Sequence, residues 1–436
     1  MKLDTDILII GSGLSGTALA ANLLHESQTL RAILLDQNSR ADFGPAYRTD
    51  CPLHLLNTRA QAMSAFPGEP DHFIRWATAH GEPAAPGYFA RRSVYRKYLQ
   101  EISDEVIASE RVHYVQGQAL ALRPLHNGWM CELESGESLS AAYVVLAFGV
   151  GKPATLEAAG AVADHPGYIA DIWASGDQEF PQGARRIALI GSGLTAMDVL
   201  LAGEAQGLTP HYTLVSRHGF LPQRHAAGHG DPVPPPPPQV SSIREMVRSI
   251  RSAAAAVPDW RSVLDAMRPR LTEYWLALSE VDQARFLRHL RPYWEVHRHR
   301  MPPQVGEAVD RLHKEGRLTI RPGQIAAIEP AGDQLRMQFQ HGGDEVFDAV
   351  INCTGLPPVP AWDSPMLRQM IGDGYAHYDV HRLGLQCDSD GRILGEHDGG
   401  RLFALGFLRR GQLYESTAAR ELGIQAREIA ATLTAE

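Results

Sequence analysis

The sequence has 436 residues, a length that corresponds to roughly two to four domains. Hydrophobic residues make up 44% of the chain and charged residues 21%, which excludes disorder of the chain as a whole. The formal net charge of −9 is opposite in sign to that of general nucleic-acid binders and proteins of anionic membranes. We therefore expect a small-molecule substrate, with no nucleic-acid or membrane partner.

The N-terminus and the cysteines predict a cytoplasmic protein. The first residues pass directly into a glycine loop, unlike a secretory signal peptide, and no segment approaches the roughly 18 apolar residues that cross a bilayer. The cysteines are scattered and include no CxxC pair, which favours a reducing compartment. They are Cys51, Cys131, Cys353 and Cys387.

The chain begins with a β-α-β unit around a glycine-rich loop. Residues 6–10 and 32–35 predict buried parallel strands, and residues 17–25 predict the helix between them. Residues 11–16 have the sequence Gly-Ser-Gly-Leu-Ser-Gly, and Asp36 ends the second strand. In the dinucleotide-binding fingerprint, the first glycine permits the tight turn, the second lets the backbone approach a pyrophosphate, and the third lets helix and strand pack. We expect a pyrophosphate on Gly11, Ser12, Gly13, Leu14, Ser15 and Gly16, and a ribose hydroxyl on Asp36.

The next segments predict further strands. Residues 112–122 and 129–133 have the composition of an antiparallel excursion, and residues 143–147 form an apolar strand that rejoins the first sheet before Phe148-Gly149.

A second β-α-β unit follows, with strands predicted at 187–190 and 212–215 around the helical stretch 197–202. Arg217 follows its second strand, where the first unit has a carboxylate. A guanidinium binds a 2′-phosphate that a carboxylate would repel, so this unit is expected to accept NADPH; the alternative is a surface arginine beside an NADH site. The expected binding residues are Gly191, Gly193, Thr195, Ala196, Ser216 and Arg217.

The remaining segments comprise a proline run, a helical region and a closing α/β part. Residues 232–238 favour an extended spacer or strap. Residues 241–312 predict helices, including one at 279–290 that begins with Ser279 and Asp282 in a capping-box-like pattern. Strands follow at 318–320, 335–339, 349–352 and 402–406, and a final helix at 416–432.

Two dinucleotide loops in one chain suggest two nucleotides, because hydride must pass from a nicotinamide to a second acceptor. The natural division is FAD in the first site and NAD(P)H in the second. The fold class is then α/β, with two Rossmann-like domains, the second inserted in the first, and a helical subdomain. We expect an FAD-binding domain formed by 1–180 and 346–436, and an NAD(P)-binding domain at 181–345 that contains the helical insert 241–312.

Several strings carry a resemblance to a known family. The order of the two loops, with Cys353-Thr354-Gly355 and residues 402–407, resembles the two-dinucleotide-binding flavoproteins. Five shorter strings resemble the bacterial FAD/NAD(P)-binding family related to class B flavin monooxygenases, whose characterised branch hydroxylates urate. They lie at 44–47, 54–57 with 62–64, 191–198, 216–222 with His225, and 294–300.

The resemblance implies FAD, a reduced nicotinamide and O2. It implies that the backbone of Ala119 meets the adenine of FAD, and that the strings containing Asn57 and Met63 lie against the isoalloxazine. No catalytic side chain is assigned. His297 and His299 alternate with arginines, a spacing that suits a strand or extended loop better than a helical zinc site, so no metal is expected.

The resulting hypothesis is that the protein is an NAD(P)H-consuming monooxygenase, which transfers one oxygen atom from a flavin C4a-hydroperoxide to a small polar substrate. The first named candidate for the substrate is urate, which would be converted to 5-hydroxyisourate. Three alternatives remain open. They are an N-hydroxylating monooxygenase of an amine or amino acid, an NAD(P)H reductase or oxidase that inserts no oxygen, and a nucleotide-sensing flavoprotein.

Overall fold

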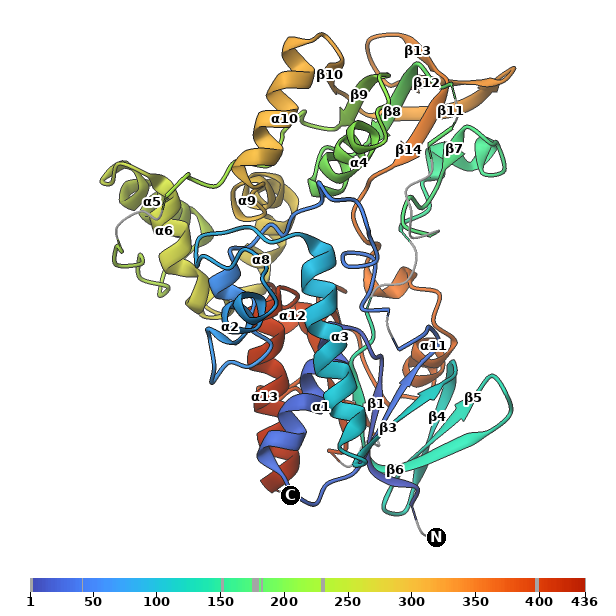
Figure 1. Ribbon diagram of the computed structural model, residues 1–436, viewed down its shortest axis with the longest axis vertical. Helices are drawn as coiled ribbons and strands as arrows, with labels where there is room; N and C mark the ends of the chain where they lie inside the picture. The colour runs from blue at the N-terminus through green and yellow to red at the C-terminus, as the bar shows by residue number, and fades with distance from the viewer. Residues whose placement is uncertain are drawn as a thin grey trace.

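The first glycine loop belongs to a seven-stranded sheet in the lower half of Figure 1. In this computed structural model, the described residues are 3–40, 42–149, 153–174, 180–181, 183–228, 232–396 and 400–435. The strand order is β3-β2-β1-β6-β5-β4, and β15 also pairs with β6. These strands are β1 (Thr5–Ile10), β2 (Ala32–Asp36), β3 (Val112–Gln116), β4 (Ala119–Leu125), β5 (Gly128–Leu133), β6 (Ser138–Leu146) and β15 (Leu402–Ala404).

The parallel part of this sheet is covered on both faces, which explains its continuous apolar runs. Helices α1, α3 and α13 cover one face, where buried alanines on α1 and α13 let the two helices pack together (Figure 1). Helix α11 packs against the other face, beside β4. The helices are α1 (Leu14–Glu26), α3 (Arg92–Ala108), α11 (Pro365–Gly372) and α13 (Ala419–Ala435).

The second glycine loop belongs to a five-stranded, all-parallel sheet with the order β10-β9-β8-β14-β7. One face carries α4 (Leu194–Ala205) and α10 (Pro303–Lys314), and the other carries an antiparallel three-stranded sheet. The parallel strands are β7 (Tyr168–Ile169), β8 (Arg186–Ile190), β9 (His211–Ser216), β10 (Leu318–Pro322) and β14 (Ala349–Asn352). The antiparallel strands are β11 (Ile325–Ala331), β12 (Gln334–Phe339) and β13 (Asp344–Phe347).

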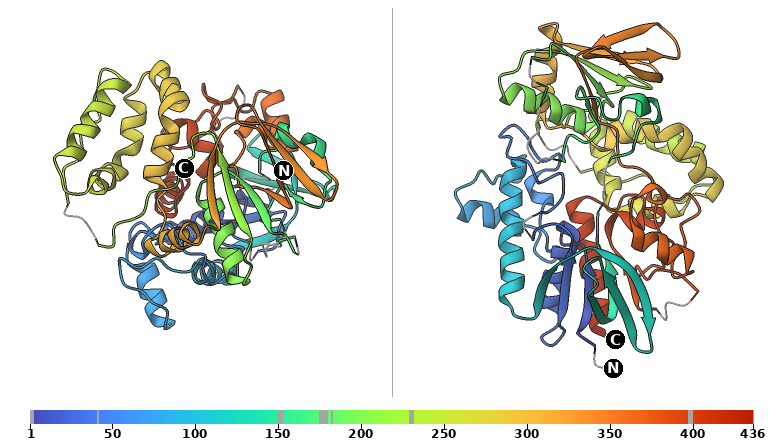
Figure 2. Two further views of the ribbon diagram at one scale, coloured as in Figure 1. Left: turned by 90° about the horizontal axis from the view of Figure 1, so that it is seen from above. Right: turned by 90° about the vertical axis from the view of Figure 1, so that its right-hand side faces the viewer.

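The helical insert has its own small core and projects from the side of the molecule between the two sheets (Figures 1 and 2). Its α-helices are α5 (Ile243–Ala255), α6 (Trp260–Met267), α7 (Leu271–Leu276), α8 (Glu280–Arg285) and α9 (Arg291–Arg298). The insert also contains a short 3-10 helix, η3 (Arg268–Arg270), and a short π-helix, η4 (Phe286–Leu290). Shorter elements elsewhere are α2 (His72–Ala79), α12 (Arg410–Leu413), η1 (Ala60–Ala62), η2 (Glu157–Val162), η5 (Val359–Ala361) and η6 (Gly406–Arg409).

The predicted fold class is confirmed, but the expected segment limits do not follow the sheets. Strands β7 and β14 lie outside 181–345 and nevertheless pair in the second sheet. Helix α10 begins inside 241–312 but packs against α4 and β10, because its apolar side chains Val305, Val309 and Leu312 are buried in the core of the second sheet. The helical insert therefore ends near residue 298.

Three local predictions can be compared directly with the structure. Ser279 caps α8 by accepting a hydrogen bond from the backbone N–H of Asp282 at 3.2 Å, as expected. The prediction of an antiparallel excursion is wrong for β3. This strand pairs in parallel with β2, because the chain turns at Gly117 before it forms the antiparallel pair of β4 and β5. The extended conformation expected around His297 is also wrong, since His297 lies in the last turn of α9.

Across the described residues, no helix combines the length and the apolar composition needed to cross a bilayer.

Candidate active site

The three glycines of the first loop have different surroundings. Gly11 has a φ of +110°, and a Cβ on Gly16 would lie 1.8 Å from the carbonyl oxygen of Gly11, so these two positions need glycine for the turn and for packing. A Cβ on Gly13 would lie 3.8 Å from its nearest neighbouring atom, the carbonyl oxygen of Phe43. The second glycine therefore faces free space, as a cradle for a pyrophosphate requires.

The first loop also has polar groups that are free to bind a dinucleotide. Helix α1 begins at Leu14 without a side-chain cap, so its first N–H groups remain available to an anion. The hydroxyl of Ser12 is buried and has no hydrogen-bond partner among the described residues. The backbone N–H of Ser12 donates to Asp36 Oδ2 at 2.6 Å, and Asn38 donates twice to Oδ1, which leaves one lone pair of Oδ2 for a ribose hydroxyl. Ser15 lies against Gly406, whose Cβ would be 3.2 Å from the Ser15 hydroxyl.

The other residues expected at the first nucleotide lie in three separate places. Ala119 begins β4, and the nearby Gly117 N–H donates to the carbonyl oxygen of Asp36 at 2.8 Å, which places the segment beside the end of β2. Met63 is 3% exposed and packs in the core of the first sheet. The carbonyl oxygen of Asn57 lies 2.9 Å from His225 Nε2, a contact to the segment that follows β9.

The second loop repeats the geometry of the first beside a cavity of about 620 Å³. Gly191 has a φ of +113°, a Cβ on Gly193 would meet nothing within 4 Å, and Ala196 is fully buried at the start of α4. The volume is in the range of small-molecule sites. The predicted residues that line it are Gly191, Gly193, Thr195, Ser216 and Arg217.

Ser216 and Arg217 differ in how freely they face this cavity. The Ser216 hydroxyl accepts from the backbone N–H of Gly219 at 3.1 Å and lies 2.8 Å from the Ser192 hydroxyl, so it orders the loop after β9. Arg217 is exposed, and no described residue forms an ion pair with it. Its guanidinium is therefore available to a phosphate.

The helical insert contributes residues that the sequence did not place at this cavity. Glu295, Val296 and His299 of α9 and its C-cap line it. His299 Nε2 lies 3.0 Å from Glu295 Oε2, and Arg410 Nη2 lies 3.6 Å from Glu295 Oε1. Burial acts to raise the pKa of Glu295, but His299, Arg291 and Arg410 lower it to about 2. The i, i+4 spacing of Glu295 and His299 was the available signal for this pair.

A buried polar junction ties the segment containing residues 54–57 to the second glycine unit. His54 is fully buried, and its Nε2 lies 2.8 Å from the backbone oxygen of Asp198 in α4. Arg92 Nη2 lies 3.0 Å from Asp198 Oδ1 and 2.8 Å from Oδ2, an ion pair whose side chains are 12% and 9% exposed. Burial lowers the pKa of His54, so the imidazole is neutral at physiological pH. The junction fixes α4 relative to the first sheet.

Comparisons with known proteins agree with this architecture. Residues 8–151 match the family model described as FAD-NAD(P)-binding. The ornithine hydroxylase PvdA from Pseudomonas aeruginosa has a TM-score of 0.70 at 16% identity over 99% of each chain. The Kutzneria sp. 744 ornithine N-hydroxylase KtzI, solved with reduced FAD, NADP+ and L-ornithine, has a TM-score of 0.67 at 14% identity over 98% of each chain.

A bacillithiol disulfide reductase from Staphylococcus aureus has a TM-score of 0.59 at 12% identity, covering 100% of this chain and 99% of the reductase. No curated protein matches the chain in sequence. The family match confirms the predicted FAD/NAD(P)-binding resemblance in the first third of the chain, and the structural matches confirm the two-dinucleotide flavoprotein fold.

Proposed function

We propose that this protein is an FAD-dependent, NAD(P)H-consuming monooxygenase that N-hydroxylates a small amine or amino acid. The observation that carries the proposal is the end-to-end likeness to two ornithine hydroxylases, which covers 99% and 98% of this chain. Nothing in these matches supports urate as the substrate. N-hydroxylation, stated above as an alternative, therefore replaces urate hydroxylation as the main hypothesis.

We assign the first loop, from Gly11 to Gly16, to the pyrophosphate of FAD and Asp36 to its ribose, because the cradle at Gly13 is open and the Ser12 hydroxyl has no partner in the described part of the chain. Ala119 is assigned to the adenine, and Asn57 and Met63 to the surroundings of the flavin ring. When bound, FAD accepts hydride from NAD(P)H and activates O2, chemistry that side chains alone do not supply. This chain's own residues bind the two nucleotides and hold them in a fixed relation through the Arg92–Asp198 pair.

We also propose that residues 1–180 and 346–436 form the FAD-binding domain and 181–345 the NAD(P)-binding domain, with η2, β7, β14 and the end of β13 belonging to the second domain. Helix α9 lines the cavity of about 620 Å³ beside the second glycine loop, which we call the NAD(P) cavity. The helical insert is therefore placed to shape the space where the nicotinamide and a substrate meet.

The cysteines of this chain do not support disulfide reduction, the activity in the name of the similar Staphylococcus aureus bacillithiol disulfide reductase. All four are free, and the sequence has no CxxC pair. Cys353 lies at the NAD(P) cavity, but burial raises the pKa of its thiol far above neutrality, so it is not a reactive thiolate.

The test is NADPH and NADH consumption by the FAD-loaded protein in air, with L-ornithine, L-lysine, cadaverine and urate added separately while H2O2 is followed. We expect one amine to accelerate consumption with little peroxide and to gain one oxygen atom on nitrogen, as seen by mass spectrometry. Oxygen gained by urate instead, or acceleration without any oxygenated product, would contradict the proposal.

Replacing Arg217 with alanine is expected to weaken NADPH binding about tenfold to a hundredfold while leaving NADH binding nearly unchanged. The reason is the loss of a charge-assisted contact to the 2′-phosphate, worth about 1.5 to 3 kcal/mol. Titration of both nucleotides against flavin reduction measures the effect. The matched control is Arg185→Ala, an exposed arginine outside the cavity, for which neither affinity should change. Equal losses of both nucleotides in the Arg217 variant would show that Arg217 does not bind the phosphate.

A further inference from the structure

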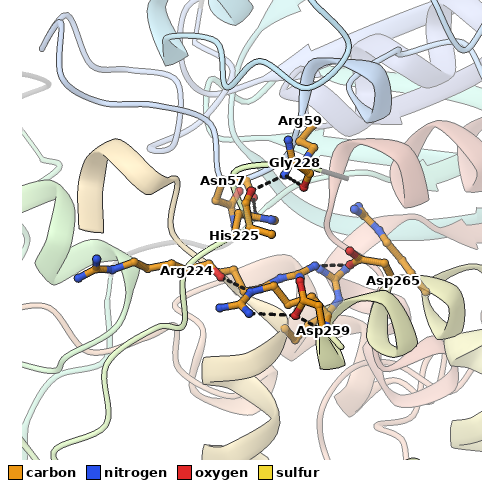
Figure 3. A network of polar contacts seen from close by, with 12 residues as sticks. Asn57, Arg59, Arg224, His225, Gly228, Asp259 and Asp265 are labelled. Carbon is orange, nitrogen blue, oxygen red and sulfur yellow. Dashed lines mark hydrogen bonds and ion pairs between the residues drawn. The ribbon is translucent and has the colours of Figure 1, made fainter. Parts of the chain in front are cut away.

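A second cavity, of about 280 Å³, lies between four segments of the chain and shares no described lining residue with the NAD(P) cavity. Arg59 reaches it from the segment that contains Asn57 in the first domain, and His225 and Gly228 from the segment after β9. Helix α6 with the residue before it contributes Asp259, Arg261 and Asp265, and Arg300 follows α9. Figure 3 shows Arg59, His225, Asp259 and Asp265 around this cavity.

The carboxylates of this cavity already have arginine partners. Arg261 Nη1 lies 3.0 Å from Asp259 Oδ1, and Arg300 forms an ion pair with Asp265. Arg59, in contrast, donates to the carbonyl oxygens of Gly87, Ala226 and Gly228 at 3.0, 2.7 and 3.0 Å (Figure 3 shows the bonds to the segment after β9). Among the described lining residues, three arginines and two aspartates give a formal charge of +1. The guanidinium of Arg59 is the one without a carboxylate among the described residues.

Two further observations concern the positive charge around His225 and a buried guanidinium N–H of Arg300 that has no acceptor among the described residues. Burial, together with the positive charges of Arg300 and Arg59, lowers the pKa of His225 to about 3, so this imidazole is neutral. Arg300 is 6% exposed, and its Nε has no hydrogen-bond partner among the described residues. A buried guanidinium N–H without an acceptor is costly, which favours an anionic ligand that supplies one.

We propose that this cavity binds a small molecule through a single carboxylate, which accepts hydrogen bonds from Arg59 and from Nε of Arg300. A monoanion balances the formal charge of +1, whereas a phosphate dianion would leave a buried negative charge and a diamine would add positive charge. The volume restricts the ligand to a small metabolite. The inference goes beyond the proposed hydroxylation and does not depend on it, because the bound carboxylate is either part of the substrate or a separate effector.

Calorimetric titration of the FAD-loaded protein, without NADPH, tests the site with probes of one chain length: pentanoate, 5-aminopentanoate and 1,5-diaminopentane, and with inorganic phosphate. We expect both carboxylates to bind with an affinity that depends on Arg59, and any binding of phosphate, or of the diamine at a hydroxylation site, to be independent of Arg59. Arg59→Gln should weaken pentanoate about tenfold or more, because a charge-assisted hydrogen bond is lost without leaving an aspartate unpaired. Arg251→Gln, an exposed arginine of α5 outside the cavity, should bind pentanoate like the unaltered protein.

Diamine or phosphate binding that Arg59→Gln weakens as strongly as pentanoate binding would overturn the proposal, as would unchanged pentanoate binding in Arg59→Gln. FAD absorbance and melting temperature establish that each variant is folded. If Arg59→Gln does not fold, the paired change Arg300→Gln with Asp265→Asn removes the second anchor without leaving a charge unpaired, and it should weaken pentanoate by a similar factor. Because no turnover is measured, a negative result here is distinct from a failure to find hydroxylation.

Discussion

Replacing Gly13 with valine is expected to abolish FAD retention while leaving the fold intact. The backbone of Gly13 has φ −61° and ψ −170°, a conformation that valine adopts, and the space beside it is open, so the protein itself tolerates the side chain. The isopropyl group would occupy the place assigned to the pyrophosphate. We expect at least about a tenfold loss of FAD affinity, or about 1.4 kcal/mol, measured as flavin absorbance per protein after desalting.

Two other glycines make this experiment specific. Gly160 also has open surroundings and is far from both loops in sequence, so Gly160→Val should keep FAD fully bound. Gly16→Ala should instead disturb the protein itself, because the Cβ would collide with the carbonyl oxygen of Gly11. A yellow, fully loaded Gly13→Val protein would refute the assignment of the first loop to FAD.

Replacing Asp198 with alanine should lower the free energy of unfolding by about 3 to 5 kcal/mol, since it leaves the guanidinium of Arg92 buried without its carboxylate. The loss should appear in denaturant unfolding, and flavin reduction by NADPH should slow because α4 is no longer fixed to the first sheet. The Arg92→Met, Asp198→Leu double variant should recover much of the stability, because no charge is left unpaired.

The exposed pair between Arg96 and Asp50 is the control for this prediction. The Asp50 side chain is 70% exposed, so Asp50→Ala should cost less than about 1 kcal/mol. If Asp198→Ala costs no more than Asp50→Ala, the Arg92–Asp198 pair does not hold the two domains together.

Both β-α-β units were predictable because their signals are local. Apolar runs, glycine spacing and the residue at the end of the second strand all lie within about 30 positions, which is the span of such a unit. The same locality explains why the Ser279 cap was found. Because these signals are local, both glycine loops can be recognised in the sequence without knowledge of any tertiary contact.

The unpredicted features depend on contacts between distant segments. Helix α9 was not expected at His297 because histidines and arginines at alternating positions suggest an extended chain, whereas the helix is set by packing of Trp294 against the insert core. The Arg92–Asp198 pair joins residues 106 positions apart, and neither residue type signals burial on its own. The carboxylates and arginines around the second cavity likewise come from three separate parts of the chain.

The order in which the two sheets can be completed follows from where their last elements lie. The first sheet and its core need β15 and α13, which come from residues 402–435. The second sheet has all its strands once residue 352 has left the ribosome. During translation, the N-terminal strands therefore keep an apolar face exposed until the second half of the chain has been synthesised. Chaperone assistance would matter most at this stage.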